Sequence, residues 1–144
     1  MQASHYKAKY FLCTLATQVA RKIVAHYNNE LAPLGLTAQQ LMALGALTFK
    51  EDISLGQLAK RLKIGKAAAA TMIKRLEALG LVTKERHPHD ARLVVLKTTE
   101  KARALEPEIH KKMVDLENTI ESQIGAAALK KIVFHLEKYL DADF

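Results

Sequence analysis

The sequence contains a single cysteine, Cys13, which excludes an intrachain disulfide bond and a metal site built from several cysteines. No apolar run approaches the roughly 18 residues of a membrane-spanning helix, and the first residues do not form a signal peptide. We therefore expect no membrane partner and a cytoplasmic location. A glycine-rich phosphate loop, a Gly-x-Ser-x-Gly elbow and a His-Glu-x-x-His motif are all absent, and the six histidines show no metal-ligand pairing. These absences predict a protein that is not an enzyme and uses no cofactor or metal.

Two short amphipathic segments in the middle of the chain predict a helix–turn–helix. The first has apolar residues at helical spacing, and Ser54 with Gln57 three residues later is typical of a capping box. Lys63-Ile64-Gly65 interrupts the pattern, so Gly65 is expected to begin a second helix that Gly80 ends. In such a unit the second helix enters the DNA major groove. Its groove-facing side would carry Lys66, Ala67, Ala68, Ala70, Thr71, Lys74 and Arg75.

A β-hairpin is predicted directly after this unit. Residues 81–86 and 92–97 are rich in β-branched and apolar side chains, and residues 87–91 between them have the composition of a turn. The hairpin would therefore form a charged wing beside the helix–turn–helix.

The positive charge of the chain is concentrated in the same region. Residues 52–101 hold eleven Lys and Arg against five Asp and Glu, a net charge of +6, whereas the rest holds eleven against ten, a net of +1. A field of one sign on one region is expected for a protein that binds a polyanion. We therefore predict double-stranded DNA as the partner.

The flanking helices carry apolar stripes that a winged helix of this size cannot cover. One stripe lies before Asn28-Asn29, and others run from Leu105 to Ile124 and, after Gly125, on to Leu140. We expect these helices to pack against a second copy, because a two-fold dimer places two recognition helices on a palindrome. The predicted fold is mainly α-helical with a small β-hairpin wing. Residues 1–34 and 103–144 would form the helical dimerisation region, and residues 35–102 the winged helix–turn–helix.

The order of these elements resembles the MarR family of bacterial transcription regulators over nearly the whole chain. The similar residues are Leu36-Thr37-Ala38-Gln39-Gln40, Leu58-Ala59, Lys74-Arg75-Leu76-Glu77, Gly80-Leu81-Val82, Pro88-His89-Asp90-Ala91-Arg92 and Thr98-Thr99-Glu100-Lys101. The resemblance implies a dimeric winged-helix protein, usually a repressor, that a small phenolic or aromatic ligand or oxidation releases from its operator. It also implies that Arg92 approaches the minor groove or phosphates while Asp90 orients its guanidinium. A surface ion pair that only holds the hairpin is the alternative.

Several residues of the DNA-binding region leave more than one interpretation open. Arg86, His87 and His89 would add phosphate contacts, although histidines at a loop tip are often only solvated. Ala67, Ala68 and Ala70 replace the Ser, Thr or Arg usual in the family, so they either serve as helix formers or touch thymine methyl groups. An adaptor that binds DNA weakly and mainly binds protein is therefore the alternative function.

The signal to which the protein responds has two candidate sites in the first helix. Arg21, His26 and Tyr27 are candidates for a pocket that takes an aromatic effector. Cys13 and Tyr27 resemble the organic-hydroperoxide-sensing branch of the family, but Ala38 and Thr17 replace its other tyrosines. Cys13 and Tyr27 would lie about 21 Å apart on one helix, at about 1.5 Å per residue, so a contact would have to cross the dimer. The alternative role of Cys13 is packing.

Overall fold

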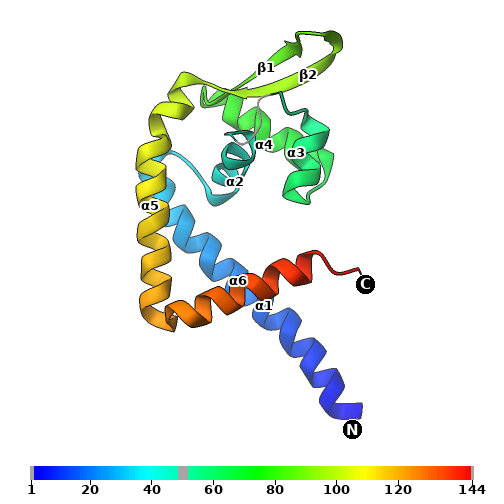
Figure 1. The fold of residues 1–144 in the computed structure, drawn as a ribbon, viewed down its shortest axis with the longest axis vertical. Coiled ribbons are helices and arrows are strands. Elements are labelled where there is room, and N and C mark those ends of the chain that lie inside the picture. Colours follow the sequence, from blue (N-terminus) through cyan, green and yellow to red (C-terminus); the bar gives the residue numbers. More distant parts are fainter. Residues whose placement is uncertain (1, 49–51, 144) are drawn as a thin grey trace. The chain divides into compact units, whose positions relative to one another are not determined.

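The computed structural model describes residues 2–48 and 52–143, and confirms a mainly helical fold with one small antiparallel hairpin. The order of elements is α1 (Gln2–Leu31), a 3₁₀ turn η1 (Ala32–Leu34), α2 (Ala38–Thr48), α3 (Leu55–Leu62), α4 (Lys66–Ala78), β1 (Val82–His87), β2 (Asp90–Thr98), α5 (Glu100–Ile124) and α6 (Ala126–Leu140) (Figure 1). None of the described helices has the length and apolar character needed to cross a bilayer.

The chain divides into two compact units, Met1–Glu106 and Pro107–Phe144. The division falls inside α5, which continues through Pro107. The first unit contains α1 to α4 and the hairpin, which is the predicted winged helix–turn–helix with its preceding helix. The second unit contains the rest of α5 and the whole of α6.

Helices α2, α3 and α4 pack together, and β2 lies against α2 and α3. Their shared core is apolar and consists of Ala43, Leu44, Leu47, Leu58, Ala59, Ala69, Ile73, Leu76, Leu81, Val82, Val95 and Leu96. Ile53, just before α3, adds a bridge to the hairpin because its carbonyl accepts a 2.8 Å hydrogen bond from the N–H of Leu96. The helices and the hairpin are thus joined by backbone bonding as well as by apolar packing.

Local hydrogen bonds determine where the helices of this unit begin. The Ser54 hydroxyl accepts from the Gln57 N–H, and the Gln57 side chain accepts from the Ser54 N–H, which confirms the expected capping box of α3. The same pair of bonds joins Thr37 and Gln40 at the start of α2. This second capping box has the Thr-x-x-Gln spacing that would have predicted it.

The end of α4 confirms the expected role of Gly80. Gly80 has a φ of +71°, its N–H donates to the Glu77 carbonyl, and the Leu81 N–H donates to the Leu76 carbonyl, both at 2.9 Å. These two bonds form a Schellman motif, which requires a left-handed residue after the helix. The turn between α3 and α4 is also as expected, with Gly65 in an extended conformation at the N-cap of α4.

The hairpin differs from the prediction at its tip. Residues 87–91 were expected to form the turn, but β1 runs to His87 and β2 starts at Asp90, so only Pro88 and His89 connect the strands. Arg86 pairs with Val94 while His87 pairs with Asp90, which leaves residues 91–93 of β2 opposite no residue of β1. This irregularity lies in the part of β2 that carries Arg92.

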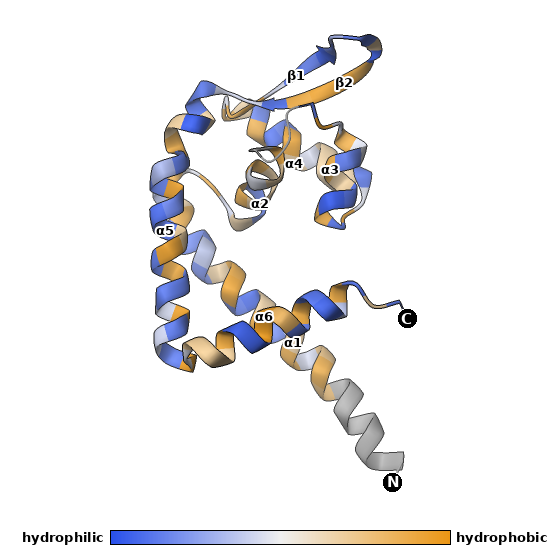
Figure 2. Cartoon of the chain, viewed as in Figure 1, coloured by the Kyte–Doolittle hydropathy of each residue, from blue (hydrophilic) through white to orange (hydrophobic). Residues whose placement is uncertain are grey.

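Hydrophobic residues recur along both terminal helical segments, as the colouring of α1 and α6 in Figure 2 shows, and many of them are exposed. Helix α1 exposes Phe11, Leu12, Leu15, Val19 and Ile23, and α6 exposes Ile132, Val133, Phe134, Leu136, Tyr139 and Leu140. No residue of α6 is buried. These faces match the stripes for which the sequence requires partners.

Candidate nucleic-acid interface

Helix α4 divides into a buried face and an exposed face that carries the predicted groove residues. Ala69, Ile73 and Leu76 are fully buried. On the other face, Lys66, Ala67, Ala68, Thr71, Lys74 and Arg75 are exposed, and Ala70 is half-buried. The packing of α4 therefore leaves all seven residues at least partly accessible.

Charge and apolar character alternate along this exposed face. Lys66 lies in the first turn of α4, Ala67, Ala68, Ala70 and Thr71 follow, and Lys74 and Arg75 lie about one turn further on. The Thr71 hydroxyl donates to the Ala67 carbonyl at 3.1 Å, so its proton is used inside the helix. Three cations thus flank a surface of methyl groups.

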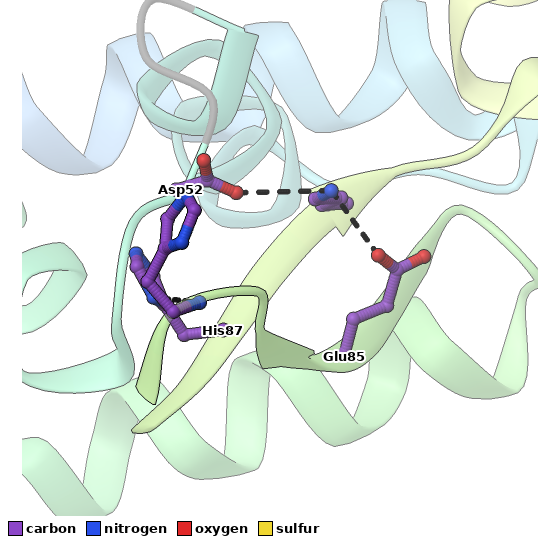
Figure 3. A network of polar contacts seen from close by, with 5 residues as sticks. Asp52, Glu85 and His87 are labelled. Carbon is purple, nitrogen blue, oxygen red and sulfur yellow. Dashed lines mark hydrogen bonds and ion pairs between the residues drawn. The ribbon is translucent and has the colours of Figure 1, made fainter. Parts of the chain in front are cut away.

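The wing arginines are exposed on the two strands of the hairpin. Among the residues that the structure describes, ion pairs engage Lys84 and Lys97 but neither Arg86 nor Arg92. The Lys97 ammonium lies 3.7 Å from Asp52 and 3.2 Å from Glu85, and Figure 3 shows these pairs at the base of the hairpin. Two lysines of the basic region are therefore neutralised locally, while both arginines keep their charge for another partner.

The contact of Asp90 differs from the one that the resemblance implies. Asp90 Oδ1 accepts a 3.0 Å hydrogen bond from the backbone N–H of Arg92, and no ion pair joins the carboxylate to the guanidinium among the described residues. The carboxylate closes a short turn of the backbone in this irregular part of β2. Asp90 therefore shapes the strand that carries Arg92 and does not clamp its side chain.

The two histidines of the wing tip contact each other. The His89 N–H donates to His87 Nδ1 at 3.2 Å, and the ring centroids are 5.9 Å apart (Figure 3). Since Nδ1 of His87 is an acceptor here, a phosphate contact from this ring would come from Nε2. Both residues thus remain candidates for phosphate contacts.

A clamp at the end of α4 was not predicted from the sequence. Lys101 Nζ donates to the Leu79 carbonyl and Thr99 Oγ1 donates to the Gly80 carbonyl, both at 2.7 Å. A lysine is favourable at this position because the C-terminus of a helix carries a partial negative charge. The residues lie 22 and 19 positions apart in the chain, so periodicity carried no signal of these contacts.

The candidate sensor residues all lie on α1. Cys13 and Arg21 are exposed, whereas His26 and Tyr27 are half-buried. Cys13 is exposed within the single chain, and α1 is one of the helices expected to pack against a second copy, so both roles of Cys13 stay predictions. The Thr17 hydroxyl donates to the Cys13 carbonyl at 2.8 Å, so Thr17 contacts the backbone of Cys13.

Comparison with known proteins gives consistent relatives. The model of the MarR family matches residues 34–93. The organic hydroperoxide resistance transcriptional regulator of Bacillus subtilis (strain 168) is 30% identical over 116 residues, which are 81% of this chain and 76% of the relative.

Solved structures of MarR-type regulators are similar to this chain over nearly its whole length. A mutant of MarR from E. coli complexed with operator DNA has a TM-score of 0.85 and 26% identity, covering 94% of this chain and 97% of that one. Bordetella bronchiseptica BpsR, whose DNA binding is regulated by 6-hydroxynicotinic acid, has a TM-score of 0.83 and 28% identity, covering 92% and 94%.

Proposed function

Because the chain belongs to the MarR family of transcription regulators, we propose that it is a dimeric repressor of a palindromic operator, released by a small aromatic or phenolic ligand. In this proposal α4 enters the major groove and the wing contacts the adjacent backbone or minor groove. Its relatives are transcription regulators, which fits a protein that is not an enzyme.

One observation carries the DNA-binding part of the proposal. The buried face of α4 leaves Lys66, Lys74 and Arg75 exposed, and the wing adds Arg86 and Arg92 without local ion pairs. Cations that are not neutralised within the protein can displace the counterions of phosphates, which is the main source of affinity for DNA. A DNA-bound structure of a family member supports the same partner.

The exposed apolar faces of α1 and α6 support the dimer. Exposed apolar side chains that cluster on one helix cost free energy in water and are typical of a protein interface. A symmetric pair satisfies both faces and presents two copies of α4 to the two halves of a palindrome. Residues 1–34 and 103–144 are therefore proposed as the dimerisation region, and residues 35–102 as the DNA-binding region.

The effector is proposed by analogy with a relative and from the residues of α1. BpsR responds to 6-hydroxynicotinic acid, which is an aromatic carboxylate. Arg21 supplies a cation for a carboxylate, and His26 and Tyr27 supply half-buried rings with polar atoms. These three residues are the proposed effector contacts.

The charge of Arg92 provides the test of DNA binding. We expect Arg92→Ala to weaken binding to a selected operator about tenfold or more at moderate salt, and to reduce the slope of log affinity against log salt by about one per subunit. Fluorescence anisotropy titrations at several salt concentrations measure both quantities. Lys111→Ala, an exposed charge on α5, is the matched control.

If Arg92→Ala binds as tightly as the parent protein with the same salt slope, the wing does not contact DNA. If the parent protein itself shows no salt-dependent binding to any duplex, the adaptor alternative holds instead.

A second candidate function is a thiol sensor, favoured by the hydroperoxide-resistance relative and by the presence of the single cysteine on α1. In this reaction the Cys13 thiolate attacks the O–O bond of a hydroperoxide, sulfur takes one oxygen to become a sulfenic acid, and the alcohol leaves. Since the chain has one cysteine, a further disulfide would need an external thiol or the second subunit.

Cys13→Ser separates the two signals. For a thiol sensor, we expect cumene hydroperoxide to release DNA from the parent protein but not from Cys13→Ser, in the anisotropy assay with mass spectrometry of Cys13. Equal release of both proteins, or no release of either, rejects the thiol mechanism and leaves the ligand mechanism in place.

A further inference from the structure

We propose that α4 recognises its operator chiefly through thymine methyl groups, which contact a methyl patch formed by Ala67, Ala68, Ala70 and Thr71. This inference rests on the proposed entry of α4 into the major groove and adds the class of DNA sequence that is bound. The half-site under the first two turns of α4 is then rich in A·T pairs whose thymines face the patch.

The position of the methyl patch is the first argument. With about 3.6 residues per turn, Ala67 and Thr71 lie on the side of α4 opposite the buried Ala69, Ile73 and Leu76. Ala67, Ala68 and Thr71 are exposed and Ala70 is half-buried, so the patch is accessible to a partner. Recognition helices contact base edges with their N-terminal residues, and these are the residues of the patch.

The shortage of hydrogen-bonding groups is the second argument. Residues 66–75 include no Asn, Gln, Asp or Glu, which are side chains that read adenine or cytosine through hydrogen bonds. The Thr71 hydroxyl already donates to the Ala67 carbonyl. The N-cap of α4, Gly65, offers no side chain either. The three alanines of the patch can therefore discriminate between bases only by apolar contact, whereas Thr71 adds a methyl group and its oxygen keeps only acceptor lone pairs.

The charges around the patch favour DNA as the partner that covers it. Lys66 precedes the patch, Lys74 and Arg75 follow it, and the exposed Arg86 and Arg92 lie on the hairpin of the same unit. Cations on both sides of an apolar centre fit a groove with phosphates along both edges and methyl groups within. Among the four bases of DNA only thymine presents a methyl group in the major groove, so a methyl patch selects thymine.

The thymine methyl group can be removed from the DNA without changing base pairing. We first select a binding site from a randomised duplex library with the parent protein, and then replace single thymines by uracil. Loss of one buried methyl group is expected to weaken binding about fourfold at each contacted thymine. Replacing such a thymine by cytosine is expected to cost more affinity than replacing it by 5-methylcytosine, because the latter keeps the methyl group.

Protein variants link the effect to particular residues of the patch. Ala67→Ser and Ala68→Ser each add a hydroxyl to the patch at little cost to the helix, and so weaken its apolar contact with a methyl group. In these variants, replacing the contacted thymine by uracil is expected to weaken binding less than about twofold. Ala78→Ser is the matched control, because Ala78 is exposed on the same helix beyond the patch and its variant should keep the full penalty. Circular dichroism verifies that all variants remain helical.

The outcomes separate this inference from the function on which it rests. Tight, sequence-selective binding that is unchanged by uracil at every thymine, or an equal penalty in all variants, overturns methyl recognition while the repressor proposal stands. Failure to select any duplex overturns the proposed function, and the methyl patch would then be a surface for a protein.

Discussion

At the scale of single residues, the two glycines at the ends of α4 have different roles. Gly80 has a φ of +71° and closes the Schellman motif, whereas Gly65 has a φ of −67° and open space where a side chain would lie. We expect Gly80→Ala to lower the free energy of unfolding by about 1 kcal/mol, because an L-residue with a side chain is strained in this conformation. Gly65→Ser should leave the free energy of unfolding unchanged or raise it by about a few tenths of a kcal/mol, because serine is a slightly better N-cap residue than glycine. Urea denaturation measures both, and an equal loss in the two variants would contradict these roles.

At the scale of secondary-structure elements, α4 is held by its buried stripe. Leu76 is fully buried against the core of the first unit, so Leu76→Ala removes apolar contacts and leaves a cavity. We expect it to lower the free energy of unfolding by about 2 to 5 kcal/mol. Met42→Ala on α2, where the side chain is 55% exposed, is the control and should cost well under half as much. Similar losses would mean that α4 is not anchored by this face.

The ion pairs at the base of the hairpin contribute less than this core. The side chains of Lys97, Asp52 and Glu85 are 39%, 39% and 51% exposed, and ion pairs at such exposure contribute about 0 to 1 kcal/mol each. We therefore expect Lys97→Met to change stability by less than about 1 kcal/mol in the same denaturation experiment. A loss as large as that of Leu76→Ala would show that the ion pairs, and not the apolar core, hold the hairpin.

At the scale of the whole molecule, the proposed function requires a second copy of the chain. Leu136 lies on α6 and is 56% exposed, so in the proposed dimer Leu136→Asp places a charge in an apolar interface. We expect a shift from dimer to monomer in sedimentation velocity, together with a loss of operator affinity of about a hundredfold, because two linked half-site contacts become one. Lys111→Asp on α5 changes charge at an exposed polar position and is the control. A variant that remains dimeric would place the interface elsewhere.

Most features that depend on residues within about four positions of each other were predicted correctly, although the capping box of Thr37 and Gln40 was not. The Ser54 capping box, the N-cap at Gly65, the left-handed Gly80 and the buried stripe of α4 are examples. Helical periodicity and caps are local, so the sequence determined them by itself. The exposed positions of α4 follow from that periodicity, and the resemblance to the MarR family follows from the motifs.

Only the tertiary structure decided the contacts between distant residues. The pairing of β1 with β2 joins residues as distant as Val82 and Thr98, and this register decides the two-residue turn and the irregularity at residues 91–93, which local composition does not specify. The pairs of Lys97 with Asp52 and of Lys101 with Leu79 likewise join residues far apart in the chain. Side chains of the same type become paired or free according to which distant groups the fold brings near them. Lysines and arginines that look equivalent in the sequence thus separate into those that are ion-paired or hydrogen-bonded within the protein, such as Lys97 and Lys101, and those that have no ion pair among the described residues, such as Arg86 and Arg92.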